Sequence, residues 1–305
     1  MQNLEQNQIL NKKENFLKTI FPFYPVKFFS NVNYSVIISF MLALRIVLGF
    51  FNINLISFGI SLSFAWLPIY IVGWFFGPII GFFFGIATDI VNYLINGGVW
   101  FWMYAIQELM IGIMAGCISI LYHKMKTKPI IFDLIIQKII IYSFALFSII
   151  YLFIYFDDIL NRTFSSGSSI DNIQIYLGIS ISFIIIFVIV IEVVNYSFKR
   201  NNFKNNRTFI KYKLFIYLTI LFVTSTILMS FILGPITFIE FWKFQHNGSL
   251  PSGLIKYGNF YYLIPRILKE TIKTPIYIIL SFLLISIINP YFDTLFKKNK
   301  YKYQR

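Results

Sequence analysis

Long apolar stretches, interrupted by short polar segments, follow one another from residue 34 to residue 289 of the chain. A helix that spans a membrane needs about 20 consecutive, predominantly apolar residues. The pattern therefore predicts about eight transmembrane helices, at 34–51, 60–76, 78–95, 102–122, 139–156, 173–195, 213–234 and 265–289. The second and third are separated only by Gly77-Pro78, a pair typical of a tight turn at a membrane face.

The composition supports this interpretation. Of the 305 residues, 58% are hydrophobic and only 12% are charged, whereas soluble domains average about 45–50% apolar and about 25% charged residues. These values exclude a cytosolic enzyme, a disordered chain and a disulfide scaffold, and they predict an all-α, multi-pass protein of the cell membrane. With one cysteine and two histidines far apart in the sequence, we expect neither a disulfide nor a metal site.

Basic residues gather in four segments that fall on one side of this eight-helix arrangement. These segments are the N-terminal tail, the connection after the fourth helix, the connection from Lys199 to Lys213, and the C-terminal tail. Together they hold 19 of the 26 Lys and Arg residues. Such residues concentrate in cytoplasmic loops, so we expect both termini in the cytoplasm. The net charge of +14 then reflects orientation in the membrane, and we expect no nucleic-acid partner.

The same pattern predicts the domain organisation. A cytoplasmic tail at 1–30 precedes a single transmembrane domain at 31–289, and a basic cytoplasmic tail follows at 290–305.

Several ionisable side chains lie inside the predicted helices, where each is costly and is therefore a candidate functional group. In one interpretation, Arg45 and Asp89 pair to hold helices together, and the lysines of the last helix reach toward the interface. In the other, the group lines a polar pocket open to the outside. At about 1.5 Å rise per residue, nearly all map to the outer half of the bilayer: Arg45, Asp89, Glu108, Arg266, Lys269, Glu270 and Lys273.

Polar and aromatic residues near this group would suit a flat ligand that carries a carboxylate. An aromatic ring can stack on a ligand ring, and Arg or Lys can bind a carboxylate. Tryptophan and tyrosine at this depth also serve as interface anchors, so both interpretations stay open. The neighbours are Asn52 and Asn54 after the first helix, and Trp102, Gln107 and Glu108 on the fourth.

Small residues at a four-residue spacing predict close helix packing on two helices. Gly81 and Gly85 lie on one face of the third helix, and contact within the bundle is the expected role. On the first helix, a similar row faces either the bundle or a partner protein. That row consists of Ser35, Ser39 and Ala43.

No sequence motif for catalysis is found. The chain lacks a G-x-x-x-x-G-K-[ST] phosphate loop, an H-E-x-x-H zinc motif and a G-x-S-x-G nucleophile turn. We therefore expect a protein that is not an enzyme, needs no cofactor and does not hydrolyse ATP. If it drives uptake, the energy must come from a gradient or from a partner subunit.

The glycine and proline residues of the third and fourth helices resemble those of a transporter family. The pattern Pro68-x4-Gly73-x3-Gly77-Pro78-x2-Gly81-x3-Gly85-x3-Asp89, followed by Gly97-Gly98 and Gly112-x3-Gly116, resembles the substrate-binding S components of energy-coupling factor (ECF) vitamin transporters. The segment from Leu263 to Pro275 is similar to the last helix of the folate-type group.

The resemblance implies a six-helix core at 31–128 and 210–289, with two inserted helices at 129–200. It implies a pocket that opens outward and assembly with a transmembrane coupling protein and two ATPases. The small residues of the first helix would dock the coupling protein. Carried over by position, the pocket would involve Asn52, Asn54, Trp102, Gln107, Glu108 and Arg266.

We therefore expect a vitamin-binding subunit, with folate as the first candidate. Arg45, Arg266 and Lys269 would meet the glutamate carboxylates of folate, and Trp102 or a nearby tyrosine would stack on the pterin. Glu108 or Asp89 would accept hydrogen bonds from the N–H groups of the pterin.

Three alternatives stay open. The first is an S component for riboflavin or another vitamin. The second is a structural or assembly membrane protein without a small ligand. The third is a membrane enzyme that acts on lipid through Glu192 and His123.

Overall fold

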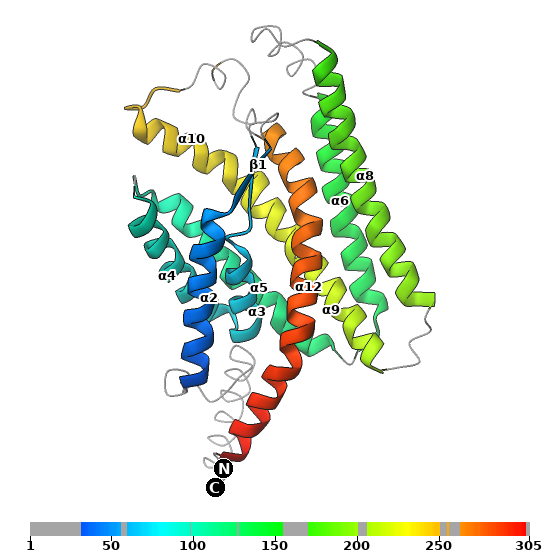
Figure 1. The fold of residues 1–305 in the computed structure, drawn as a ribbon. Coiled ribbons are helices and arrows are strands. Elements are labelled where there is room, and N and C mark those ends of the chain that lie inside the picture. The colour runs from blue at the N-terminus through cyan, green and yellow to red at the C-terminus, as the bar shows by residue number, and fades with distance from the viewer. Residues whose placement is uncertain are drawn as a thin grey trace, which may run out of the picture. The chain divides into compact units, whose positions relative to one another are not determined.

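The computed structural model describes residues 32–55, 60–97, 99–126, 128–154, 170–200, 206–250, 255 and 263–302, so the predicted tail at 1–30 lies outside the described residues. Within these ranges a two-stranded sheet joins β1 (Asn52–Leu55) to β2 (Ile60–Ser63), and the other elements are helices (Figure 1). The helices are α2 (Val32–Phe50), α3 (Leu67–Phe76), α4 (Pro78–Asn96), α5 (Trp102–Met125), α6 (Ile131–Ile154), α8 (Ile170–Arg200), α9 (Asn206–Ser225), the π-helical η2 (Thr226–Leu233), α10 (Gly234–Gln245) and α12 (Leu263–Lys302).

Seven helical segments in the described ranges are long and apolar enough to cross a membrane. One of them, Thr208–Gln245, runs through α9, η2 and α10 without a break and extends beyond the predicted span at 213–234. The predicted class, an all-α integral membrane protein, is confirmed. α12 continues to Lys302, through most of the segment predicted as a basic tail.

The second predicted span, 60–76, has a different structure from the one expected. Its first residues form β2, and only Leu67–Phe76 is helical. A helix of 10 residues is about 15 Å long, about half of the 30 Å hydrocarbon core. All of its residues are buried, so its continuous apolar sequence reflects contact with other helices. The predicted turn is confirmed: Gly77, at φ 88°, ends α3, and Pro78 begins α4.

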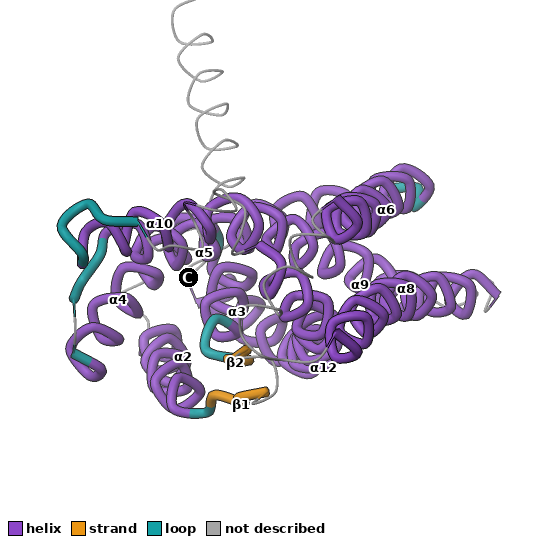
Figure 2. The backbone as a smooth tube through the Cα atoms, turned by 90° about the horizontal axis from the view of Figure 1, so that it is seen from above, coloured by secondary structure: helices purple, strands orange, loops and turns teal. Residues whose placement is uncertain are grey.

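The chain divides into two compact units. Unit 1 holds α2 to α5 and the part of α12 from Ser281 onward, and unit 2 holds α6 to α10 and α12 up to Leu280. Within unit 2, α6 and α8 lie side by side in both views (Figure 2) and are in contact.

Glycines bring α3, α4 and α5 of unit 1 into backbone contact. A Cβ atom on Gly81 would clash with the backbone of Gly112, and one on Gly112 would clash with that of Gly81. Further along the same face, a Cβ on Gly85 would lie 2.8 Å from the carbonyl oxygen of Glu108. The glycine row predicted to pack within the bundle does so, and it fixes the position of Glu108 on α5.

In unit 2, buried polar side chains join α6, α8 and α9. The Nζ atom of Lys213 lies 3.1 Å from Oδ2 of Asp133, and Lys213 is fully buried. The hydroxyl of Tyr217 donates to Oδ1 of the same aspartate at 2.9 Å. The amide of Asn195 donates to Gln137 at 3.3 Å. Lys213, predicted to lie in a basic connection, is therefore part of α9 instead, buried and paired with a carboxylate.

We predict that Gly112→Ala lowers the free energy of unfolding by about 1–3 kcal/mol, because the added methyl group has no space between the α4 and α5 backbones. The matched control is Gly178→Ala on α8, where a Cβ would meet no heavy atom within 4 Å. Since alanine favours helix more than glycine does, the control should be neutral or slightly stabilising. Thermal unfolding in detergent measures both variants, and equal effects would contradict the packing described.

Candidate functional site

Arg45 of α2 and Glu108 of α5 form an ion pair inside unit 1. Their Nη2 and Oε1 atoms are 2.5 Å apart, and each residue is only 6% exposed. Arg45 and Met41 are the buried residues of α2. Gly49, one turn further along, leaves room for the guanidinium, since a Cβ there would lie 3.3 Å from Nη1. The sequence analysis predicted that both residues lie in the outer half of the bilayer, but it suggested Asp89 as the partner of Arg45.

The pair is not fully hydrogen-bonded. Nε of Arg45 and Oε2 of Glu108 are buried without a hydrogen-bond partner among the described residues. A cavity of about 10 Å³ adjoins the guanidinium and is lined by Gly49, Thr88 and Asn92 among others. A space of this size holds about one water molecule, whereas ligand pockets measure about 300–1,000 Å³. In this conformation, the cavity beside Arg45 cannot admit a vitamin.

Asp89 lies on α4 and has a different partner from the one expected. Its Oδ2 atom accepts a hydrogen bond of 2.9 Å from the indole nitrogen of Trp100, in the loop between α4 and α5. Gly97, at φ 65°, ends α4 and starts this loop. Trp102 follows at the start of α5 and is about half exposed. Exposed tryptophans at a helix end suit a membrane interface.

The other predicted pocket residues of unit 1 differ in their surroundings. Gln107 is buried on α5, next to Glu108. Asn52 and Asn54 lie in β1 rather than in an irregular loop, and their side chains lie outside the described part.

The first turns of α12, in unit 2, carry a cluster of charges. Glu270 is buried, and its Oε1 atom accepts from Nζ of Lys273 at 2.9 Å and from the hydroxyl of Ser230 at 2.7 Å. Arg266 and Lys269 lie on the same turns and are partly exposed. Gly234 lets the guanidinium of Arg266 approach the start of α10, because a Cβ at that position would clash with it.

This cluster has an excess of positive charge. Three cationic side chains, Arg266, Lys269 and Lys273, accompany one carboxylate within two helical turns. The N-terminal turns of a helix add a partial positive charge. Since Lys273 neutralises Glu270, the local field favours an anion near Arg266 and Lys269. The sequence predicted these cations, but it did not single out Ser230, because a serine inside an apolar helix has no distinguishing pattern.

The small-residue row on α2 is partly at the surface. Ser39 and Ala43 are exposed, and Ser35 is partly exposed. The large side chains of Val36 and Phe40, on the same helix, are about 60% exposed. This helix therefore presents an apolar face with small residues to its surroundings.

The two residues proposed for chemistry on lipid, Glu192 and His123, make contacts with neighbouring side chains. Glu192 pairs with Lys138 at 3.1 Å and accepts a hydrogen bond from Tyr142 at 2.9 Å. His123 is exposed near the end of α5, in ring contact with Tyr122. In the described part, no three His, Cys, Asp or Glu side chains come together as a metal site.

Comparison with known proteins shows relatives along nearly the whole chain. The chain is 30% identical over 268 residues to "Uncharacterized protein MG313 homolog" of Mycoplasma pneumoniae, which covers 86% of this chain and 91% of that protein. It is 29% identical over 276 residues to "Uncharacterized protein MG313" of Mycoplasma genitalium, or 88% of this chain and 94% of that protein.

A family model described as "ECF transporter, substrate-specific component" matches residues 33–164. The matched range begins in α2, includes the glycine-packed helices α3 to α5 with the Arg45–Glu108 pair, and continues through α6. The family is a transporter component that binds substrate, and it is not a family of enzymes. This chain is a multi-pass protein of the cell membrane that belongs to the family of its mycoplasma relatives, and over residues 33–164 it is similar to the substrate-specific components of ECF transporters.

Proposed function

We propose that this chain captures a vitamin outside the cell as the substrate-binding subunit of an ECF-type importer, with folate as the first candidate. The observation that carries the proposal is the family match over residues 33–164. The sequence has no phosphate-binding loop of its own, so the energy for uptake would come from partner ATPases. A transmembrane coupling protein and two ATPases would complete the importer.

The exposed face of α2 is the surface that we propose for docking of the coupling protein. Helices associate in a membrane where small residues let their backbones approach, and Ser39 and Ala43 are such residues at exposed positions. Only 11% of this helix is buried, the lowest share of the seven candidate spans. We propose that the coupling protein covers this face.

The cationic cluster on α12 supports an anionic substrate. The glutamate part of folate carries two carboxylates, which match the charge of Arg266 and Lys269. Glu270 and Ser230 would hold Lys273 in place behind them. Stacking by Trp102, polar contacts from Asn52, Asn54 and Gln107, and hydrogen bonding of the pterin to Asp89 or Glu108 remain predictions.

Tracer binding tests the substrate. We predict that purified protein retains radiolabelled folate and that Arg266→Gln and Lys269→Gln each weaken retention about tenfold, because a hydrogen bond to a charged group contributes about 1.5–3 kcal/mol. The control is Lys124→Gln, an exposed lysine at the end of α5. Retention of riboflavin instead of folate would contradict the folate assignment but would still support a vitamin-binding subunit. Absence of any retained vitamin would contradict both.

One observation favours a second candidate, a structural or assembly membrane protein with no small ligand. The Arg45–Glu108 pair is closed, and the cavity of about 10 Å³ beside it has no room for a vitamin. In this alternative the pair only joins α2 to α5. In the transport proposal, it also shapes a region that opens when substrate binds.

Variants of the pair first test its contribution to stability, which both candidates share. Arg45→Met and Glu108→Met should each lower the free energy of unfolding by about 3–5 kcal/mol, because each leaves a buried charge without a partner. The double variant should recover most of this loss. As a control, Lys138→Met removes one member of an ion pair whose side chains are 44% and 34% exposed, which should cost about 1 kcal/mol or less.

The double variant also separates stability from function. If the transport proposal holds, it unfolds like the wild type but retains less vitamin. Single variants as stable as the wild type would show that the buried pair does not form.

A further inference from the structure

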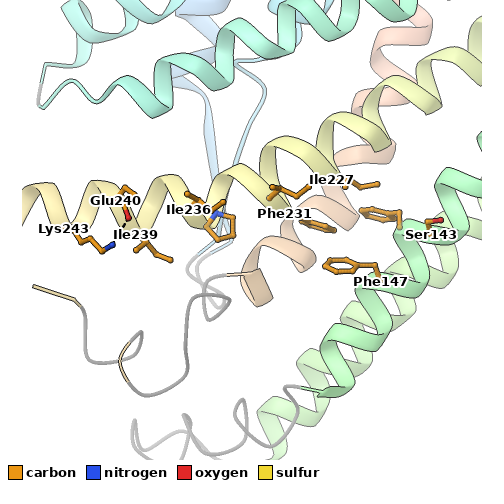
Figure 3. A pocket seen from close by; sticks show the side chains of 11 residues that line it. Ser143, Phe147, Ile227, Phe231, Ile236, Ile239, Glu240 and Lys243 are labelled. Atoms are coloured by element: carbon orange, nitrogen blue, oxygen red, sulfur yellow. Dashed lines mark hydrogen bonds and ion pairs between the residues drawn. The ribbon is translucent and has the colours of Figure 1, made fainter. Parts of the chain in front are cut away.

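A groove of about 700 Å³ runs along unit 2, far larger than the cavity beside Arg45. Side chains of α6, η2 and α10 line it (Figure 3). Its volume lies within the range of sites for small molecules, about 300–1,000 Å³. Among the residues whose side chains the structure describes, none of those expected from the sequence to bind a vitamin lines it.

Most of the groove is apolar. Phe144 on α6 stacks on Phe231 of η2 with ring centroids 5.5 Å apart, and Phe147 lies 5.9 Å from the same ring. Ile232 and Ile236 continue the surface and are 49% and 47% exposed. An apolar surface of this kind in a membrane-spanning segment matches hydrocarbon chains.

One end of the groove is charged. Glu240 and Lys243 lie on α10, with Oε1 and Nζ 2.7 Å apart and both side chains partly exposed. They project at the end of the groove away from the phenylalanines (Figure 3). The basic connection before α9 predicts that α9 starts in the cytoplasm, so the charged end lies toward the outside.

The length of the groove corresponds to one leaflet. Ile227 and Lys243, both in its lining, are 16 residues apart along η2 and α10. At the α-helical rise this is about 24 Å, an upper bound because a π-helix rises less per residue. Half of a bilayer, with its headgroup region, is about 20–22 Å thick. A lipid of the outer leaflet can therefore place its headgroup at α10 and its chain beside the phenylalanines.

The η2 segment, which forms one wall of the groove, is hydrogen-bonded to α12. On this π-helical segment, Thr226 bonds to Thr274 at 3.0 Å and Ser230 donates to Glu270 at 2.7 Å. π-Helical turns are rare and are often found at functional sites. The polar face of η2 is thus fixed to α12, and its apolar side chains Ile227 and Phe231 line the groove.

We propose that this groove binds a phospholipid of the outer leaflet with a zwitterionic headgroup. Lys243 contacts the phosphate, Glu240 contacts the ammonium group, and an acyl chain lies along Ile236 and Phe231. A carboxylate at the mouth disfavours an anionic headgroup, which would have one partner and one repulsive neighbour. This site is separate from the proposed vitamin site, and it does not depend on the function proposed above.

Native mass spectrometry of the full chain tests the proposal. The protein is reconstituted into bilayers of equal parts phosphatidylcholine and phosphatidylglycerol, then extracted in mild detergent, and the retained lipid is identified by mass. We expect one phosphatidylcholine per chain. Ile236→Trp fills the groove and should abolish retention. The double variant Glu240→Gln and Lys243→Gln should lower it about a hundredfold, the effect of losing two charge-assisted contacts of about tenfold each.

Matched controls lie at positions of unit 2 outside the groove lining. Val193→Trp places the same indole at a 55%-exposed position of α8 outside the groove lining. Lys138→Gln breaks another exposed ion pair, 3.1 Å long, also outside it. Both should retain phosphatidylcholine as the wild type does, and unfolding temperatures will show whether each variant folds.

Three outcomes would overturn the proposal. The first is equal retention of lipid by Ile236→Trp and the wild type. The second is preferential retention of phosphatidylglycerol. The third is a retained water-soluble molecule that Ile236→Trp displaces, which would make the groove the substrate site. Loss of folate retention with lipid retention intact would affect only the vitamin proposal.

Discussion

Lys213 is fully buried in α9 and is neutralised by Asp133 of α6 at 3.1 Å, and the other buried charges of the described spans follow the same rule. Moving an isolated charge into a medium of low dielectric costs several kcal/mol even after the protein relaxes, so a buried ion needs a counter-ion and hydrogen bonds. Arg45 meets Glu108 in unit 1, and in unit 2 Lys273 meets Glu270. Two of these pairs join separate helices. The third joins α12 to η2 through Ser230.

The ion pair and the glycines of unit 1 depend on each other. Because Gly85 packs against the backbone of Glu108, α4 and α5 approach closely and the carboxylate points where Arg45 can meet it. Through Arg45, α2 is tied to this bundle while most of its surface stays exposed. A helix in which only Met41 and Arg45 are buried is well suited to a partner helix.

The sequence predicted seven of the eight spans, the Gly77-Pro78 turn and the glycine contacts, because long apolar runs and four-residue glycine spacing depend on local chain geometry. It also identified Arg45 and Glu108 as unusual, but not as partners. Pairing depends on the rotation of two helices 63 residues apart in the chain, and Asp89 was an equally good candidate by depth alone. The prediction of a full span at 60–76 was wrong, because a buried half-length helix and a full span are both continuously apolar in sequence.

Lys213 illustrates a second limit. Counting charges assigned it to a cytoplasmic connection, whereas only the fold shows that it pairs with Asp133, which also accepts a hydrogen bond from Tyr217. The groove of unit 2 could not be predicted for a similar reason. Its apolar residues look like any lipid-facing stretch, and the π-helical geometry of η2 has no sequence signature.

The central claim is that this chain binds substrate for an importer powered by other subunits. The most direct measurement is native mass spectrometry of the affinity-tagged chain, purified in mild detergent from cells that also produce the coupling protein and ATPases of the same organism. The account predicts a complex of this chain with one coupling protein and two ATPases. A chain that purifies alone, with no ATPase under conditions that keep the other subunits assembled, would contradict it.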